Sequence, residues 1–197
     1  MTDFFLFIVT AVTALAVENA VFARALGLGR ETMFMNSARS GILLGGVLTW
    51  MCVLSSLFVA LVNFLIAGSA YIVMIRPMAY LAGIVAVYLL TALTIHKGLA
   101  AYRERLMQTL PISTFNTALF GAFYISASQT FNFFQTTGYA LGTGAGYTAA
   151  LLITYFARKR LAISPIPRSF RGLPVLLIYL GLISLAVYGL IGQRLPT

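Results

Sequence analysis

Two long stretches of the sequence carry no charged side chain, and they constrain the fold more than any other feature. Residues 40–75 form an uncharged run of 36, and residues 106–157 form one of 52. Only 9% of the chain is charged and 60% is hydrophobic, whereas soluble domains carry charge on about 25% of their residues. Most of the protein surface must therefore face a lipid bilayer rather than water.

The charged residues divide the chain into segments of transmembrane length. A helix needs about 20 apolar residues to cross a bilayer, so the run of 36 residues must turn once. Asn63 and the Gly68-Ser69 pair favour that turn, and polar residues between 126 and 137 predict a loop in the longer run. The predicted spans are residues 4–26, 41–66, 77–95, 109–125, 137–157 and 173–192. We therefore expect an all-α integral membrane protein, with six transmembrane helices in a single polytopic domain of residues 1–197.

The cations gather in loops that six spans would place on one side. The first, third and fifth loops hold eleven of the 13 Lys and Arg residues, and only Arg76 and Arg194 fall on the other side. Because Lys and Arg mark cytoplasmic loops, both termini are predicted to lie outside the cytoplasm, with the chain in a bacterial or archaeal cell (inner) membrane. The net charge of +9 is explained by the cations of these loops, so it does not indicate a nucleic-acid partner.

Related motifs in the two halves indicate an internal repeat. The first span contains E-N-A-V-F and the fourth F-N-T-A-L-F, while the second begins S-G-I-L-L-G-G and the fifth T-G-Y-A-L-G-T-G. Three helices per half is an odd number, so we expect a 3+3 inverted-topology repeat of residues 1–96 and 97–197 with interrupted helices 1 and 4. Asn19 and Asn116 reach about the same depth and either face each other or serve as interhelical hydrogen-bonding groups. The glycine-rich starts predict close helix packing.

Glu18 is the only acidic residue inside a predicted span. A carboxylate there is costly, so it is protonated, paired or wetted. Arg24 would lie on a different face of a continuous helix, and no direct pair is expected. Glu18 either contributes to a cation or proton path or caps backbone groups where the helix breaks. The polar mid-membrane site then consists of Glu18, Asn19, Asn116 and Thr117.

Four longer motifs follow one another along the chain: N-A-V-F-A-R-A-L-G-L-G, I-R-P-M-A-Y, L-P-I-S-T-F-N-T-A-L-F-G and R-L-A-I-S-P-I-P-R-S-F-R-G. Their order resembles the integral-membrane subunits of the Rnf and Nqr ion-translocating oxidoreductases, nearest to the RnfA and NqrE branch. The resemblance covers nearly the whole chain. It implies a place in a complex that couples electron transport to Na⁺ or H⁺ translocation, with sister membrane subunits as partners.

The resemblance also implies a shared cofactor whose ligands are changed here. In the family, two such subunits hold one [2Fe-2S] cluster, each with a Cys from the first span and a Cys from the fourth. The corresponding positions are Gly29 and Thr117, which offer neither thiolate nor imidazole, so no cofactor is predicted in this chain. Cys52 matches no ligand position and is expected to be a small buried hydrophobe, and His96 a helix-terminal residue.

Two functions remain open from the sequence. The chain is either a subunit of an Rnf/Nqr-type complex, acting in its ion path or scaffold, or a cluster-free inverted-repeat transporter of ions or small solutes, acting alone or as a homodimer. Neighbouring genes for flavin-bearing and ferredoxin-like partners would favour the first. Phosphate-loop, dinucleotide-binding and Ser-His-Asp motifs are missing, so the chain is not expected to be catalytic alone.

Overall fold

The computed structural model describes residues 2–27, 35, 37–66, 71–98 and 102–191. Over these residues the chain forms helices and turns and no strand, which confirms the all-α prediction. The elements are α1 (Thr2–Val12), η1 (Thr13–Val17), α3 (Ala38–Ile66), α4 (Ile72–Gly98), α5 (Arg103–Thr114), α6 (Thr117–Ser128), α7 (Phe133–Ala162), η2 (Arg168–Phe170) and α8 (Leu173–Ile191).

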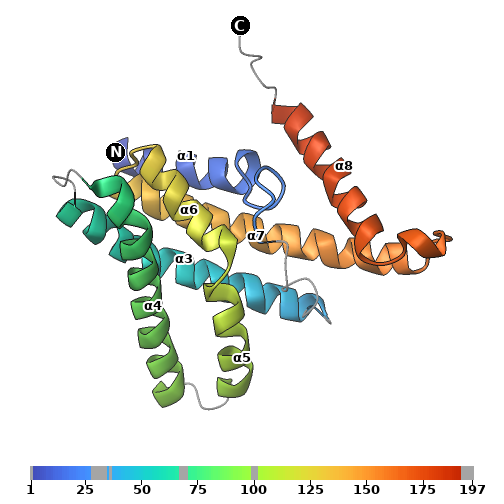
Figure 1. The fold of residues 1–197 in the computed structure, drawn as a ribbon, viewed down its shortest axis with the longest axis horizontal. Helices are drawn as coiled ribbons and strands as arrows, with labels where there is room; N and C mark the ends of the chain where they lie inside the picture. The colour runs from blue at the N-terminus through green and yellow to red at the C-terminus, as the bar shows by residue number, and fades with distance from the viewer. Residues whose placement is uncertain (1, 28–34, 36, 67–70, 99–101, 192–197) are drawn as a thin grey trace, which may run out of the picture.

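Helix α7 is the central element (Figure 1). It packs against α1, η1, α3 and α6, and its last part packs against α8. Glycines permit the close approach: a Cβ on Gly144 would lie 2.5 Å from Cα of Thr49 in α3, and a Cβ on Gly142 would collide with the Ala11 carbonyl in α1. The interpretation of the glycine-rich span as a packing surface is therefore confirmed.

Within the described residues, three helices are long and apolar enough to cross a membrane. They are α3 over Ala38–Leu65, α4 over Ile72–Gly98 and α7 over Phe133–Ala162. The other apolar helices are shorter, at Asp3–Val17, Thr117–Ser128 and Leu173–Gly189. Large apolar side chains cover the outside, among them Phe64 at 80% and Met74 at 79% exposure, as expected for a surface in contact with lipid. The six-span arrangement stays a prediction.

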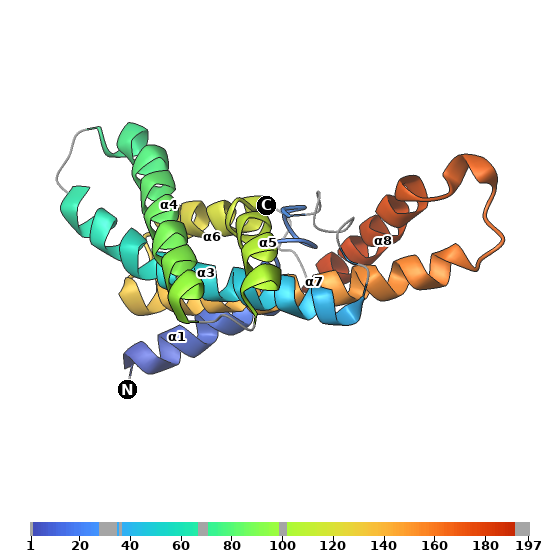
Figure 2. The same ribbon diagram turned by 90° about the horizontal axis from the view of Figure 1, so that it is seen from below.

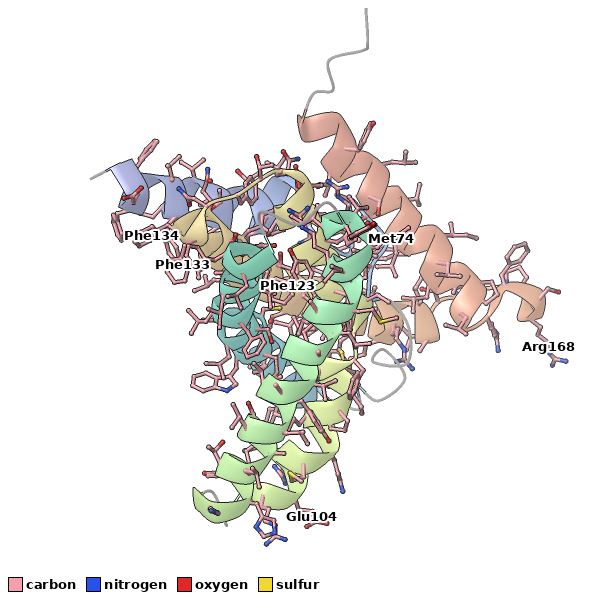
Figure 3. The ribbon with its side chains drawn as sticks, turned by 60° about the vertical axis from the view of Figure 1, so that its left-hand side comes forward. Met74, Glu104, Phe123, Phe133, Phe134 and Arg168 are labelled. Carbon is pink, nitrogen blue, oxygen red and sulfur yellow. The ribbon has the colours of Figure 1, made fainter. Side chains whose placement is uncertain are left out.

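Helix α4 pairs with α5, and helix α8 pairs with the end of α7. Helices α4 and α5 pack against each other, and Figure 3 shows Met74 near the start of α4 and Glu104 near the start of α5 at opposite ends of this pair. Helix α8 doubles back along the end of α7 after a turn that contains Arg168 (Figures 2 and 3). Leu176 and Leu180 of α8 are buried there against Ala157 of α7.

The loop predicted between 126 and 137 is present but shorter than expected, because both flanking helices extend into the polar stretch. Helix α6 continues to Ser128, and α7 begins after a turn of four residues. The Ser126 hydroxyl donates to a carbonyl one turn back at 2.9 Å, so a polar side chain is satisfied inside the helix. Asn132 and Gln135 form a reciprocal capping box that starts α7.

Candidate functional site

The first helical segment ends in a π-helical turn and places Asn19 at a break in the chain. Element η1 ends at Val17, and Asn19 is buried, at 4% exposure. Its Nδ2 donates to the Leu15 carbonyl at 2.9 Å, and its Oδ1 accepts the Val21 N–H at 3.0 Å. The asparagine therefore satisfies backbone groups that the break frees, which offsets the cost of burying a polar side chain.

A second break separates α5 from α6 at Asn116. This residue is the N-cap of α6, and its Oδ1 accepts the Ala118 N–H at 2.7 Å. Its Nδ2 donates to the Tyr147 hydroxyl of α7 at 2.8 Å. Both interruptions expected from the sequence are thus present, and at each one an asparagine side chain bonds to the freed backbone.

Hydrogen bonds join the two breaks through four residues, Gly27, Asn116, Thr117 and Tyr147, which we call the crossing network. The Gly27 N–H donates to Thr117 Oγ1 at 2.8 Å, and the Tyr147 hydroxyl donates to the Gly27 carbonyl at 3.1 Å. Together with the bond from Asn116 to Tyr147, these contacts tie the turn after the first break to the start of α6.

Gly27 has no room for a side chain. Its φ is +77°, in the left-handed region, and a Cβ there would lie 2.5 Å from Tyr147 Cε2 and 2.8 Å from Asn116 Oδ1. Conformation and close approach both require glycine. Asn116 and Thr117 were singled out from the sequence, but Gly27 and Tyr147 were not. The only signal for Gly27 is its place in the motif N-A-V-F-A-R-A-L-G-L-G, and nothing distinguishes Tyr147 from its neighbours in the glycine-rich span.

The two asparagines meet consecutive residues of α7. A Cβ on Gly146 would lie 2.8 Å from Asn19 Nδ2, and the next residue, Tyr147, accepts the bond from Asn116. Asn19 and Asn116 therefore lie at a similar level along α7. The helix that both of them contact is the element that brings the two motifs together.

Glu18 forms an ion pair with Arg24, contrary to the expectation from the sequence. Arg24 Nη2 lies 3.2 Å from Glu18 Oε2, and the Tyr139 hydroxyl of α7 donates to the same carboxylate oxygen at 3.0 Å. The expectation assumed a continuous helix. Because the helix ends before Glu18, the chain turns back and brings Arg24 alongside it.

The ion pair borders a cavity of about 380 Å³ between the first break and α8. Glu18 and Arg24 line one side, and Ser184 and Tyr188 of α8 line the other. The Glu18 side chain is 28% exposed and the Arg24 side chain 42%. The carboxylate is thus paired, hydrogen-bonded and open to a hollow, an arrangement in which it could exchange a proton or contact a cation.

The other residues singled out from the sequence lie apart from this site. Cys52 is fully buried in α3 within the main apolar core, as predicted. His96 is exposed in the last turn of α4, as predicted. Gly29, one of the two positions that correspond to cluster ligands in the family, lies outside the described residues.

Comparison with known proteins identifies the family. The sequence profile of the family described as "Rnf-Nqr subunit, membrane protein" matches residues 7–193. Relatives named as the A subunits of ion-translocating oxidoreductase complexes include the one from Yersinia enterocolitica, 31% identical over 192 residues and 98% of each chain. Those from Photorhabdus laumondii and Syntrophotalea carbinolica are 30% identical over 192 residues, 98% of each chain, and 28% identical over 179 residues, 91% of this chain and 93% of the relative. Because the match extends over nearly its whole length, this chain belongs to the Rnf-Nqr family of membrane subunits.

Proposed function

We propose that this chain is a membrane subunit of an ion-translocating oxidoreductase complex, that it has no iron–sulfur cluster of its own, and that it acts in the ion path or scaffold. The names of its relatives support the complex, and the family supports sister membrane subunits as partners. The remaining parts of the proposal rest on the two breaks and on the residues that join them.

The contact between Gly27 and Thr117 carries the proposal. Thr117 stands at a family ligand position, and its hydroxyl accepts the Gly27 N–H at 2.8 Å. A cluster needs thiolate or imidazole ligands, and the whole sequence has one Cys and one His, which lie in α3 and at the end of α4. The residues present do not fit the group. At position 117, where the family has a cluster-ligating cysteine, this chain has a threonine that forms a hydrogen bond between the two breaks.

The crossing network supports a scaffold role. Each hydrogen bond contributes about 0.5–1.5 kcal/mol, and the three bonds of the network hold the turn after the first break, α6 and α7 in one arrangement. A sister subunit would then bind to a pair of helix breaks whose arrangement the crossing network of this chain already fixes.

The group of Glu18, Arg24 and Tyr139 supports a role in the ion path. A carboxylate at a helix break, open to a cavity, is the arrangement by which membrane transporters handle cations and protons. Asn19, next in sequence, holds the break that exposes it.

We also propose that the chain crosses the membrane six times, as two sets of three helices with inverted topology. The contacts of Asn19 and Asn116 with consecutive residues of α7 support a repeat in which the two breaks reach a similar depth. We place the chain in the cell (inner) membrane, with both termini outside the cytoplasm, because most cations fall in the first, third and fifth loops.

The alternative function is a cluster-free transporter of an ion or small solute, acting alone or as a homodimer. The observation that favours it is the same replacement of ligands, since a chain without a carrier need not serve a redox complex. Affinity purification from native membranes distinguishes the two functions. Stoichiometric sister subunits support the complex, and a chain recovered alone or with its own copy supports the transporter.

Iron analysis and an absorption spectrum of the purified chain test the cluster-free part. We expect iron well below one atom per chain and no thiolate-to-iron band. A purified [2Fe-2S] protein, treated identically, shows that the assay detects a cluster where one is present. Stoichiometric iron with a charge-transfer band in the unaltered chain would overturn this part of the proposal.

A further inference from the structure

A second cavity, of about 830 Å³, lies between the start of α3 and α5, away from the crossing network. The two helices come from different halves of the chain and run at a steep angle to each other (Figure 1). Ser113 Oγ donates to the Leu44 carbonyl at 3.0 Å, which joins α5 to α3 at the inner end of the cavity. This bond fixes the distance between the walls.

The outer end of the cavity is cationic. Arg39 lies in the first turn of α3 and Arg105 in the first turn of α5, and both line the cavity. Ser37 and Ser40 fix the start of α3 by exchanging backbone-to-hydroxyl bonds of 3.2 Å in each direction. Two arginines, one from the first turn of each helix, therefore line the same cavity, and the helix dipoles also favour an anion near them.

The positive charge at this end is not balanced by the part of the protein that the structure describes. Where both partners are described, Glu18 and Arg24 form the only ion pair, and no described acidic side chain lines the cavity. Glu104, which precedes Arg105, is exposed and does not line it. Guanidinium groups bind phosphate oxygens through paired, charge-assisted hydrogen bonds.

The inner end of the cavity is apolar. Leu43 lies one helical turn beyond Arg39, and Ile112 lies two turns, about 10 Å, beyond Arg105. Moving inward, the lining on α3 changes from cationic to aliphatic, and the lining on α5 passes from Arg105 through the polar Gln108 and Thr109 to the apolar Pro111 and Ile112. A free anion would use only the outer end, whereas a molecule with a charged head and a hydrocarbon chain would contact both.

We propose that this cavity binds an anionic phospholipid, with its phosphate between Arg39 and Arg105 and part of an acyl chain against Leu43 and Ile112. Inorganic phosphate shares the headgroup chemistry but leaves the apolar end unfilled. Basic pockets between transmembrane helices are a known form of lipid-headgroup site. The lipid would bridge the two halves of the chain at a point that the crossing network does not reach.

Lipid binding to the full chain tests the proposal without any sister chain. The protein is purified in detergent, freed of lipid and titrated with phosphatidylglycerol, phosphatidylcholine or inorganic phosphate, while bound lipid is measured by native mass spectrometry and the unfolding temperature is followed. We expect phosphatidylglycerol to bind at least about tenfold more tightly than phosphatidylcholine and to raise the unfolding temperature. Inorganic phosphate is expected to have little effect.

Matched double variants locate the site. Arg39→Gln/Arg105→Gln and Lys97→Gln/Arg103→Gln each remove two positive charges, but the second pair lies outside the cavity. We expect the first to weaken phosphatidylglycerol binding roughly 30-fold and the second to change it by less than about threefold. Equal weakening in both variants would overturn the proposal. On the unaltered chain, equal binding of the two lipids, or a response to inorganic phosphate as large as that to phosphatidylglycerol, would overturn it as well.

Discussion

The backbone N–H of Gly27 donates to the hydroxyl of Thr117 at 2.8 Å, across 90 positions of sequence. The two residues belong to the two helix breaks, so this bond joins the halves of the chain where both leave helical geometry. Tyr147 reinforces the contact from α7, because its hydroxyl donates to the Gly27 carbonyl and accepts from Asn116. The arrangement makes the breaks depend on each other.

Thr117→Val should destabilise the chain by about 1–2 kcal/mol, because it leaves the Gly27 N–H without its acceptor while keeping the side-chain volume. Thr117→Ser is the control, since it keeps the hydroxyl. Unfolding in detergent, followed by circular dichroism, measures both. If the valine variant unfolds at the same denaturant concentration as the serine variant, the bond does not contribute to the stability of the chain.

Tyr147→Phe should cost more than loss of a single bond, about 2 kcal/mol or more, because one hydroxyl serves both the Gly27 carbonyl and the Asn116 amide. Tyr124→Phe is a matched control on α6, where the tyrosine is 55% exposed. The same unfolding assay applies. Similar stabilities for the two phenylalanine variants would contradict a joining role for Tyr147.

Two glycine substitutions should act in opposite directions. Gly144→Ala places a Cβ 2.5 Å from the backbone of Thr49 and should destabilise the chain by about 1–3 kcal/mol. Gly46→Ala meets nothing within 4 Å and should stabilise α3 by about 0.5–1 kcal/mol through its helix propensity. Unfolding of both variants in one detergent checks the pair, and a neutral Gly144→Ala would show that α3 and α7 do not pack backbone against backbone at this glycine.

Hydropathy predicted the long helices because burial in lipid depends on composition alone. The predicted span 41–66 and the helix Ala38–Ile66 end at the same residue, and the last helix begins at Leu173 as predicted. The two breaks fall at asparagines in predicted spans, where an amide side chain can bond to backbone groups that a break frees. Asn19 and Asn116 both find such partners.

Contacts that depend on the path of the chain after a break were not predictable from spacing. The spacing of Glu18 and Arg24 excludes a pair only on a continuous helix, and the helix ends at Val17. Polar composition overstated the length of the loop between 126 and 137, because hydroxyls such as that of Thr137 bond to the carbonyls of their own helix. No sequence pattern marks Tyr147, because its hydrogen bonds to Gly27 and Asn116 depend on the positions of the two breaks.

Glu18→Gln should abolish cation-dependent activity of the assembled complex while leaving expression intact, because the amide still accepts from Tyr139 but cannot carry charge or exchange a proton. Vesicles containing the complex, assayed for Na⁺ or H⁺ uptake driven by electron transfer, give the measurement. Glu104→Gln, an exposed carboxylate at the start of α5, is the charge-matched control and should retain uptake. Unchanged uptake in Glu18→Gln would remove the carboxylate from the ion path and leave it the structural task of holding Arg24 beside the break.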